Sequence, residues 1–282
     1  MNDHSPQPIV FVRGCFDDLK TIDIRFTQEA AKLGDVHALL FSDHASQAIL
    51  KKETKYPLNE RRYYLENIRY VNQLSIVDNT DHNTIPLSIA LAEGSNRKLI
   101  WAVRESDASR DKEIFCEQNG ILYQVITDKA LSRFPPHTSS VNELNGKRKV
   151  MVSGCFDWVH SGHVRFFEEA SQFGELYVVV GHDSNLFLLK GEGHPMFSQE
   201  ERRYWVGSIK FVTRAMISSG DGWLDAKPEI ERIKPDVFIV NKDGDKPEKQ
   251  ELFKKLNIEY KVLERKPKPG LSARISTDLR GF

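Results

Sequence analysis

Short apolar runs alternate with amphipathic stretches along the second half of the chain. The predicted elements are strands at 149–153, 176–181, 214–218 and 237–241, helices at 164–173, 198–210 and about 223–233, and a last helix and strand ending near Glu264. Continuous apolar runs of this length are typical of buried parallel strands, and the amphipathic stretches between them of crossover helices. The pattern predicts an α/β fold with a doubly wound parallel sheet and right-handed crossovers.

The same pattern occurs twice. Residues 8–35 and 148–175 align at an offset of 140 and share Gly-Cys-Phe-Asp, then Arg-Phe, a Glu-Ala pair and a glycine. Glu-Arg-Arg-Tyr also recurs, at 60–63 and 201–204. An internal duplication is the interpretation of such self-similarity. It predicts two tandem Rossmann-like domains, the first at 1–132 and the second at 147–282, with a Pro-, Ser- and Asn-containing linker at 133–146.

Bulk composition excludes several classes of protein. Among the 282 residues, Lys plus Arg and Asp plus Glu both number 40, so no net charge draws the chain to nucleic acid or to an anionic membrane. The three cysteines have no Cys-x-x-Cys spacing, so neither a disulfide framework nor a zinc site is expected. No run of eighteen apolar residues and no signal peptide is visible, which predicts a cytoplasmic protein without a membrane span.

A glycine-containing turn directly after the strand at 149–153 carries the candidate chemistry. It reads GCFDWVHSGH over 154–163 and leads into a helix. Small residues let backbone N–H groups approach an anion, and the helix N-terminus adds partial positive charge. Two imidazoles from one turn can both donate to phosphate oxygens, although an isolated histidine pair is usually an ordinary part of a surface turn. The candidate residues are Gly154, Cys155, Phe156, His160, Gly162 and His163.

The segment Gly-Cys-Phe-Asp followed by HSGH resembles the HxGH signature of the nucleotidylyltransferase superfamily, and more narrowly of the cytidylyltransferases. The resemblance implies the nucleotidylyltransferase fold, with His160 and His163 as catalytic residues that bind the triphosphate. They would stabilise the charge that grows while an acceptor phosphate attacks, without a covalent enzyme intermediate. It also implies Mg²⁺ bound with the nucleoside triphosphate, although the sequence contains no dedicated metal cage.

Two further motifs resemble the same family. Lys190, in the stretch VVVGHDSNLFLLKGEGHP, is similar to the family's lysine that reaches the triphosphate, which makes it a third candidate catalytic residue. Arg202, in Glu-Arg-Arg, resembles the arginine of the E-R motif that approaches a phosphate, although such charges are often a solvated helix face. The resemblance implies acceptor binding by Asp157 and Asp183, for which a bonded turn and a helix N-cap are equal alternatives.

The C-terminal segment resembles the I-S-T part of the cytidylyltransferase R-T-x-G-I-S-T-T motif, whose hydroxyl and N–H groups hold the nucleotide phosphates. The residues concerned are Arg274, Ile275, Ser276 and Thr277. The segment departs from the motif, because Leu271 stands in the place of the arginine, Arg274 in that of the glycine and Asp278 in that of the last threonine. The base that is recognised is therefore left open.

The first copy has lost the histidine signature. Lys20, Thr21, Ile22 and Asp23 stand where the second copy has His160 to His163. Transfer chemistry is not expected there, because an aspartate would repel an anion. We interpret this copy as a degenerate domain that packs against the active one, shapes its acceptor cleft or mediates a homodimer. Tandem domains of this type resemble the ethanolamine-phosphate cytidylyltransferases.

The resemblance implies transfer of CMP from CTP to a small phosphorylated acceptor, with release of pyrophosphate. The acceptor would be a phosphoalcohol such as phosphoethanolamine or glycerol 3-phosphate. An adenylyltransferase that uses ATP is the alternative within the same fold, because the HxGH signature contacts phosphates rather than bases. A non-catalytic nucleotide-binding protein is a third reading, against which the intact His160, His163 and Lys190 argue.

Overall fold

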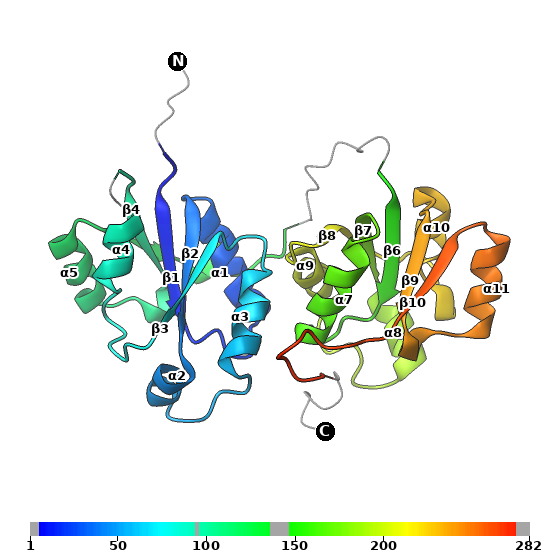
Figure 1. The fold of residues 1–282 in the computed structure, drawn as a ribbon, viewed down its shortest axis with the longest axis horizontal. Helices are drawn as coiled ribbons and strands as arrows, with labels where there is room; N and C mark the ends of the chain where they lie inside the picture. The colour runs from blue at the N-terminus through cyan, green and yellow to red at the C-terminus, as the bar shows by residue number, and fades with distance from the viewer. Residues whose placement is uncertain (1–5, 94–95, 136–146, 275–282) are drawn as a thin grey trace, which may run out of the picture. The chain divides into compact units, whose positions relative to one another are not determined.

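The computed structural model describes residues 6–93, 96–135 and 147–274. The chain forms two compact units, at Met1–Arg133 and Phe134–Phe282. Each unit contains one parallel five-stranded sheet flanked by helices (Figure 1). The predicted α/β fold with two tandem Rossmann-like domains is therefore confirmed. The predicted domain boundaries stay predictions, and most of the linker lies outside the described residues.

In unit 1 the sheet has the order β3-β2-β1-β4-β5, and all the pairings are parallel. Its elements are β1 (Ile9–Gly14), α1 (Thr21–Ala31), β2 (Asp35–Phe41), α2 (Asp43–Leu50), α3 (Leu58–Glu66), β3 (Gln73–Val77), α4 (Leu87–Glu93), β4 (Leu99–Arg104), the 3₁₀ turn η1 (Glu105–Asp107), α5 (Arg110–Asn119), β5 (Leu122–Ile126) and α6 (Asp128–Leu131).

In unit 2 the sheet has the order β10-β9-β6-β7-β8 and is again parallel throughout. Its elements are β6 (Lys149–Gly154), α7 (Ser161–Ser171), β7 (Glu175–Val180), α8 (Asp183–Lys190), α9 (Gln199–Gly207), β8 (Val212–Ile217), η2 (Gly222–Leu224), α10 (Lys227–Ile233), β9 (Val237–Asn241), η3 (Lys242–Gly244), α11 (Pro247–Lys255) and β10 (Glu259–Leu263). Counted from the first strand of each unit, the two sheets have the same topology.

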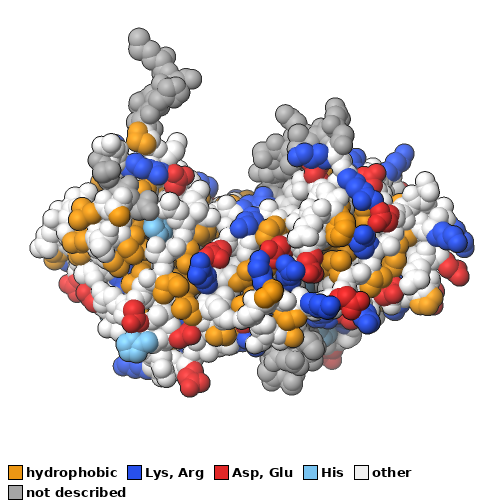
Figure 2. All heavy atoms as spheres, in the orientation of Figure 1, with side chains coloured by type: hydrophobic (Ala, Val, Ile, Leu, Met, Phe, Trp, Pro, Cys, Tyr) orange, Lys and Arg blue, Asp and Glu red, His pale blue; other side chains and the backbone are white. Residues whose placement is uncertain are grey.

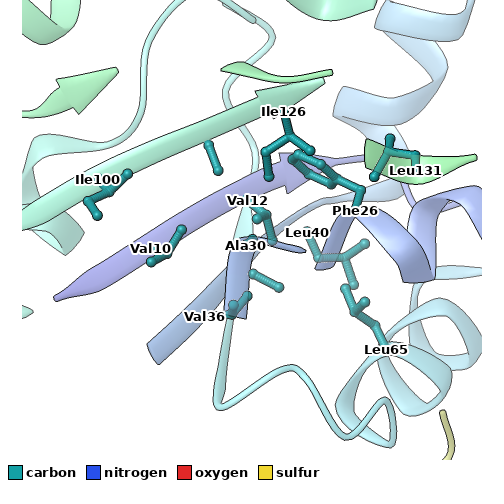
Figure 3. Close-up of a cluster of buried hydrophobic side chains, with 12 residues drawn as sticks. Val10, Val12, Phe26, Ala30, Val36, Leu40, Leu65, Ile100, Ile126 and Leu131 are labelled. Atoms are coloured by element: carbon teal, nitrogen blue, oxygen red, sulfur yellow. The ribbon is translucent and has the colours of Figure 1, made fainter. Parts of the chain in front are cut away.

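The apolar runs of the strands are continuous because helices cover both faces of each sheet. In β1, Val10 and Val12 belong to a cluster on one face (Figure 3), while Ile9 and Phe11 belong to a cluster on the other. Helix α1 contributes Phe26 to the first of these clusters. Burial of such side chains stabilises the fold by about 1.5–3 kcal/mol each, which is why the apolar periodicity predicts the strands well.

Apart from shifts of one to three residues at the ends of other elements, the predicted elements of unit 2 differ from the observed ones in three places. Helix α7 begins at Ser161, three residues before the predicted start, because His160 caps it. Helix α8 was not predicted as an element. The predicted helix at 223–233 is instead the turn η2 followed by α10, which starts at Lys227 with a proline in its first turn.

The strand order locates the expected ligand site. The first strand of each unit lies between the second and the fourth, so the chain winds outward from it in both directions. Ligands of open α/β sheets bind beyond the carboxyl ends of the strands at this switch point. In unit 2 the switch point is the end of β6, where the GCFD turn begins.

Acidic and basic side chains are interspersed over the face of the molecule shown in Figure 2. This distribution agrees with equal totals of the two charges. Within the described ranges, no helix combines the length and the apolar character that a membrane crossing requires.

Candidate functional site

A pocket of about 250 Å³ lies beyond the carboxyl end of β6, and we call it the histidine pocket. It is lined by residues 153–157, His160, Gly162, His163, Phe166, Lys190, Val240, Asn241, Asp243, Gly244, Lys249 and Arg265. A second pocket of about 170 Å³, the side pocket, lies between α7 and the segment 265–274. Both are lined by Gly162, Phe166, Asn241 and Arg265, so they are adjacent parts of one depression.

His160 is the N-cap of α7, and its ring is held by the first turn of that helix. Its Nδ1 accepts a hydrogen bond from the Gly162 backbone N–H at 3.1 Å, and the residue is only 3% exposed. Because Nδ1 is an acceptor, the neutral ring carries its proton on Nε2, which is then a donor. A Cβ atom on Gly162 would lie 2.9 Å from Cε1 of this ring, so only glycine lets the cap form without displacement.

His163 lies one helical turn away, with its ring centroid 4.1 Å from that of His160. Phe156 packs edge-on against His163 at 5.5 Å, in a backbone conformation with φ of 51°. A Cβ on Gly154 would approach the Phe156 ring to 2.9 Å, which explains the glycine. The Nδ1 atom of His163 is buried without a hydrogen-bond partner among the described residues. Such a polar atom is costly unless a ligand or water satisfies it.

The surroundings of the two histidines keep both rings neutral. Burial, followed by Arg265 and Arg274, lowers the pKa of His160 from 6.5 to about 3. Burial also lowers the pKa of His163 well below its ordinary value, with further contributions from His160, Arg265 and Lys190. Burial is the larger cause of both shifts, and the positive charges of the pocket add to it. An anion would relieve this repulsion.

Several residues that line the histidine pocket were not predicted from the sequence, among them Asn241, Lys249 and Arg265. Asn241 ends β9, and its Oδ1 is buried without a hydrogen-bond partner among the described residues. Lys249 donates to the Gly244 carbonyl at 2.9 Å, and burial lowers its pKa. Arg265 follows β10 and pairs with Asp243. The positions of Asn241 and Arg265, at or just after the ends of β9 and β10, were the signal that could have identified them, whereas Lys249 lies in α11.

Arg202 lies beneath the pocket rather than in its lining. Its side chain is fully buried and donates to the backbone carbonyls of Phe197 (2.9 Å), Cys155 (2.7 Å) and Gly181 (2.7 Å). It also bonds Asp183 Oδ1 at 2.7 Å. The structure thus does not bring Arg202 or Asp183 to the pocket surface. The predicted phosphate contact of Arg202 and the predicted acceptor contact of Asp183 stay predictions.

The degenerate unit contains the same arginine network. Arg61 is buried and donates to the carbonyls of Tyr56 (3.0 Å), Cys15 (2.6 Å) and Phe41 (3.0 Å), and it bonds Asp43 at 2.6 Å. A network that survives in a copy without the histidines does not depend on them. It ties the ends of the first two strands of each sheet to the loop before the third helix.

Asp157 also serves a structural contact that both units share. Its Oδ1 accepts from the backbone N–H groups of Met196 at 2.8 Å and Phe197 at 3.1 Å. In unit 1, Asp17 accepts from the corresponding backbone N–H groups, that of Lys55 at Oδ2 and that of Tyr56 at Oδ1. Asp157 lines the histidine pocket but is only 2% exposed, and its predicted acceptor contact stays a prediction.

The remaining predicted residues divide into two groups. Gly154, Cys155, Phe156 and Lys190 line the histidine pocket together with the two histidines, and Arg274 lines the side pocket. Ile275, Ser276 and Thr277 lie outside the described residues. In the parts of the chain with described coordinates, no cluster of three His, Cys, Asp or Glu side chains could hold a metal ion.

Comparisons with known proteins give related matches. A family model described as cytidylyltransferase-like matches residues 151–280. An FAD synthase from Aciduliprofundum boonei is 37% identical over 121 residues, which are 42% of this chain and 78% of that protein. A bifunctional protein HldE from Campylobacter concisus is 34% identical over 128 residues, 43% of this chain and 26% of that protein.

A solved structure also matches part of the chain. The crystal structure of the lipopolysaccharide core biosynthesis protein from Thermoplasma volcanium GSS1 is 28% identical, with a TM-score of 0.36, and the match covers 42% of this chain and 98% of that one. The chain spans most of the FAD synthase and about a quarter of the HldE protein.

Proposed function

Because this chain belongs to the cytidylyltransferase-like family, we propose that unit 2 transfers a nucleoside monophosphate from a nucleoside triphosphate to a small phosphorylated acceptor. Pyrophosphate is the second product. The observation that carries the proposal is the arrangement of His160, His163, Lys190 and Arg265 around one pocket at the switch point of the sheet. An ordinary surface turn does not explain two buried imidazoles whose pKa values nearby cations lower.

In the proposed reaction, an oxygen of the acceptor phosphate attacks the α-phosphorus of the nucleotide. The new P–O bond forms while the bond from the α-phosphorus to the bridging oxygen breaks, and the electron pair leaves with pyrophosphate. The Nε2–H of His160 donates a hydrogen bond to the triphosphate. The Nδ1–H of His163, which has no partner among the described residues, donates a second one. Lys190 and Arg265 stabilise the negative charge that develops on the leaving group.

A metal ion would arrive with the nucleotide, because the two carboxylates that line the histidine pocket are already engaged. Asp157 already accepts two backbone hydrogen bonds, and Asp243 pairs with Arg265, so neither is free to build a cage. Mg²⁺ bound by the triphosphate would shield its charge and assist the departure of pyrophosphate. The residues of the chain then need only orient the phosphates.

The nucleoside would extend from the histidine pocket into the side pocket, because the two share Gly162, Phe166, Asn241 and Arg265. We favour ATP as the donor, since the product named in FAD synthase contains an adenylyl group. CTP is the second candidate, supported by the description of the family. The unpartnered Oδ1 of Asn241 could accept from the exocyclic amine of either base.

The first experiment is a turnover assay with the purified full-length chain and Mg²⁺. ATP and CTP are offered separately, each with phosphoethanolamine, glycerol 3-phosphate, sugar phosphates and FMN, and pyrophosphate release is measured. Release that requires both one nucleotide and one acceptor supports the proposal and identifies both substrates. Absence of release with every pair would overturn it.

Two variants connect the activity to the site. His163→Ala removes one imidazole of the pocket and should abolish most pyrophosphate release. His44→Ala is the matched control, because His44 is an exposed histidine of unit 1 that lies outside both pockets. Equal loss of activity in the two variants, or equal retention, would contradict the assignment of the site to unit 2.

A further inference from the structure

Unit 1 contains a cavity at the carboxyl ends of its strands, at the place that corresponds to the histidine pocket of unit 2. Its volume is about 560 Å³, within the range of small-molecule sites. Basic side chains at its lining outnumber the single acidic one, Asp107. The basic residues are Arg13, Lys51, Arg104 and Lys112, and His82 lies beside them.

Two of these cations, Arg13 and Arg104, have no basic counterpart in the histidine site. At the positions of His160, His163 and Lys190, unit 1 has Lys20, Asp23 and Leu50, so the anion-binding groups of unit 2 are lost. New cations stand on neighbouring strands. Arg13 is the penultimate residue of β1, where β6 has Ser153, and Arg104 ends β4, where β9 ends in Asn241.

Lys112 is the cation that both units share. It donates to the carbonyl of Asp107 at the end of η1, as Lys249 donates to that of Gly244 at the end of η3. Both lysines line the cavity of their unit, and burial lowers the pKa of both. The cavity of unit 1 therefore contains one cation that corresponds to a cation of unit 2, Lys112, and two that do not, Arg13 and Arg104.

Arg13 is half-buried, Lys112 is buried, and both line the cavity. The Arg13 guanidinium donates to the backbone carbonyls of Asn79 (3.0 Å), Asp81 (2.6 Å) and Thr84, which are neutral. In the described part of the chain, neither cation forms an ion pair. Burial lowers the pKa of Arg13 to about 10, and the charge of Arg13 also lowers the pKa of Lys112. The carboxylates of Asp81 and Asp107 offset the cost of desolvating these two charges only in part, so a bound anion would stabilise both cations.

Two donors in the same lining lack acceptors. The Nε–H groups of Arg13 and Arg104 are buried and have no hydrogen-bond partner among the described residues. Arg104 already forms an ion pair with Asp23 at 3.2 Å, so its charge is neutralised. Its Nε–H group can still donate a hydrogen bond to a ligand. An oxyanion with several acceptor oxygens would satisfy these donors together.

We propose that the cavity of unit 1 binds a small organic phosphate monoester without turning it over. A phosphate dianion matches the cations Arg13 and Lys112 and the unsatisfied Nε–H donors, and an apolar wall for the organic group is formed by Ala48, Ile49 and Phe26. A triphosphate fits less well, because Asp23 stands where unit 2 has its second histidine. This inference rests on unit 1 alone and does not depend on the function proposed for unit 2.

The experiment follows the indole N–H signal of Trp101 by NMR in the full-length chain. Trp101 lines the cavity and is the one tryptophan among the four that belongs to unit 1. The Trp101→Phe variant identifies its signal. Inorganic phosphate and phosphoethanolamine are titrated as probes, and acetate as a carboxylate probe. Because the Trp101 signal reports on the cavity of unit 1, binding at unit 2 does not enter the readout.

Both phosphate probes should shift the Trp101 signal to saturation, and acetate should shift it little. Lys112→Met should weaken binding roughly tenfold or more, since it removes a charge-assisted hydrogen bond, and Lys112→Arg should restore much of it. Lys51→Met, which changes an exposed residue at the rim, should weaken binding less and tests the charge where folding is not at risk. Lys52→Met, an exposed lysine outside the cavity, should leave binding unchanged.

Three results would overturn the proposal. The first is a Trp101 signal that no phosphate probe shifts. The second is a shift that acetate reproduces at the same concentration. The third is equal binding by the wild type, Lys51→Met and folded Lys112→Met proteins.

Discussion

Arg202 and Arg61 occupy equivalent positions in the two units, and substitutions at both test whether this arginine stabilises the fold or binds phosphate. In Arg202→Met the four hydrogen bonds of a completely buried guanidinium are lost, and three backbone carbonyls lose a donor. Asp183 is 43% exposed, so water can solvate it again, and the carbonyls carry most of the cost. We expect unit 2 to lose about 3–5 kcal/mol of unfolding free energy, as is typical when one partner of a buried polar network is removed.

The matched substitution lies in the degenerate unit. Arg61→Met removes the same contacts around Cys15, Phe41 and Asp43, so unit 1 should lose a similar free energy. Arg202→Lys should not rescue unit 2, because one ammonium cannot reach acceptors spread around a planar guanidinium. Arg62→Met is the control, since Arg62 is 53% exposed and pairs with its helical neighbour Glu66, and the expected loss is within about 1 kcal/mol.

The assay is denaturant unfolding of the full-length chain, followed by far-UV circular dichroism and by tryptophan fluorescence. The nucleotide KM of each folded variant is measured in parallel under native conditions. The structural role predicts a shifted unfolding transition in both Arg202→Met and Arg61→Met. An Arg202→Met protein of unchanged stability with a strongly raised nucleotide KM would refute the reasoning and favour a phosphate contact.

Two further predictions concern the histidine pocket. The pKa of His160 is about 3 in the folded chain and near 6.5 when unfolded, so between these values the unfolded state binds the extra proton and stability falls as pH falls. His160→Asn keeps an N-cap acceptor but removes this titrating group. When the free energy of unfolding is measured at several pH values, its dependence on pH should be weaker in the variant by up to about 1.4 kcal/mol per pH unit. The same pH dependence in the variant and the wild type would contradict this. In Gly162→Ala, the new Cβ displaces the His160 ring, so pyrophosphate release should fall sharply while stability changes by no more than about 1 kcal/mol. Normal turnover in that variant would show that the cap geometry does not matter.

The sequence by itself determined the architecture. Apolar runs such as 149–153 form strands that are buried on both faces of a sheet. Such burial requires apolar side chains at successive positions but does not depend on which residues pack against them, so the sequence alone predicts it. The repeat of Gly-Cys-Phe-Asp predicted two copies of one fold, and the turn at 154–163 predicted where the histidines meet. These are local patterns, and α7 follows the turn directly in the chain.

The tertiary structure decided what contacts what. Arg265 lies about one hundred residues after His163 in the chain, yet its charge lowers the pKa of that ring, and no local pattern reveals such a pair. Arg202 is polar and lies in the first turn of a helix, a position that predicts solvent exposure. Its side chain is nevertheless fully buried, and the carbonyls directly after β6 and β7 accept its hydrogen bonds. In unit 1 the sequence showed only that the histidines were lost. The convergence of Arg13, Arg104 and Lys112 on one cavity depends on parallel strands that bring their carboxyl ends to the same edge of the sheet.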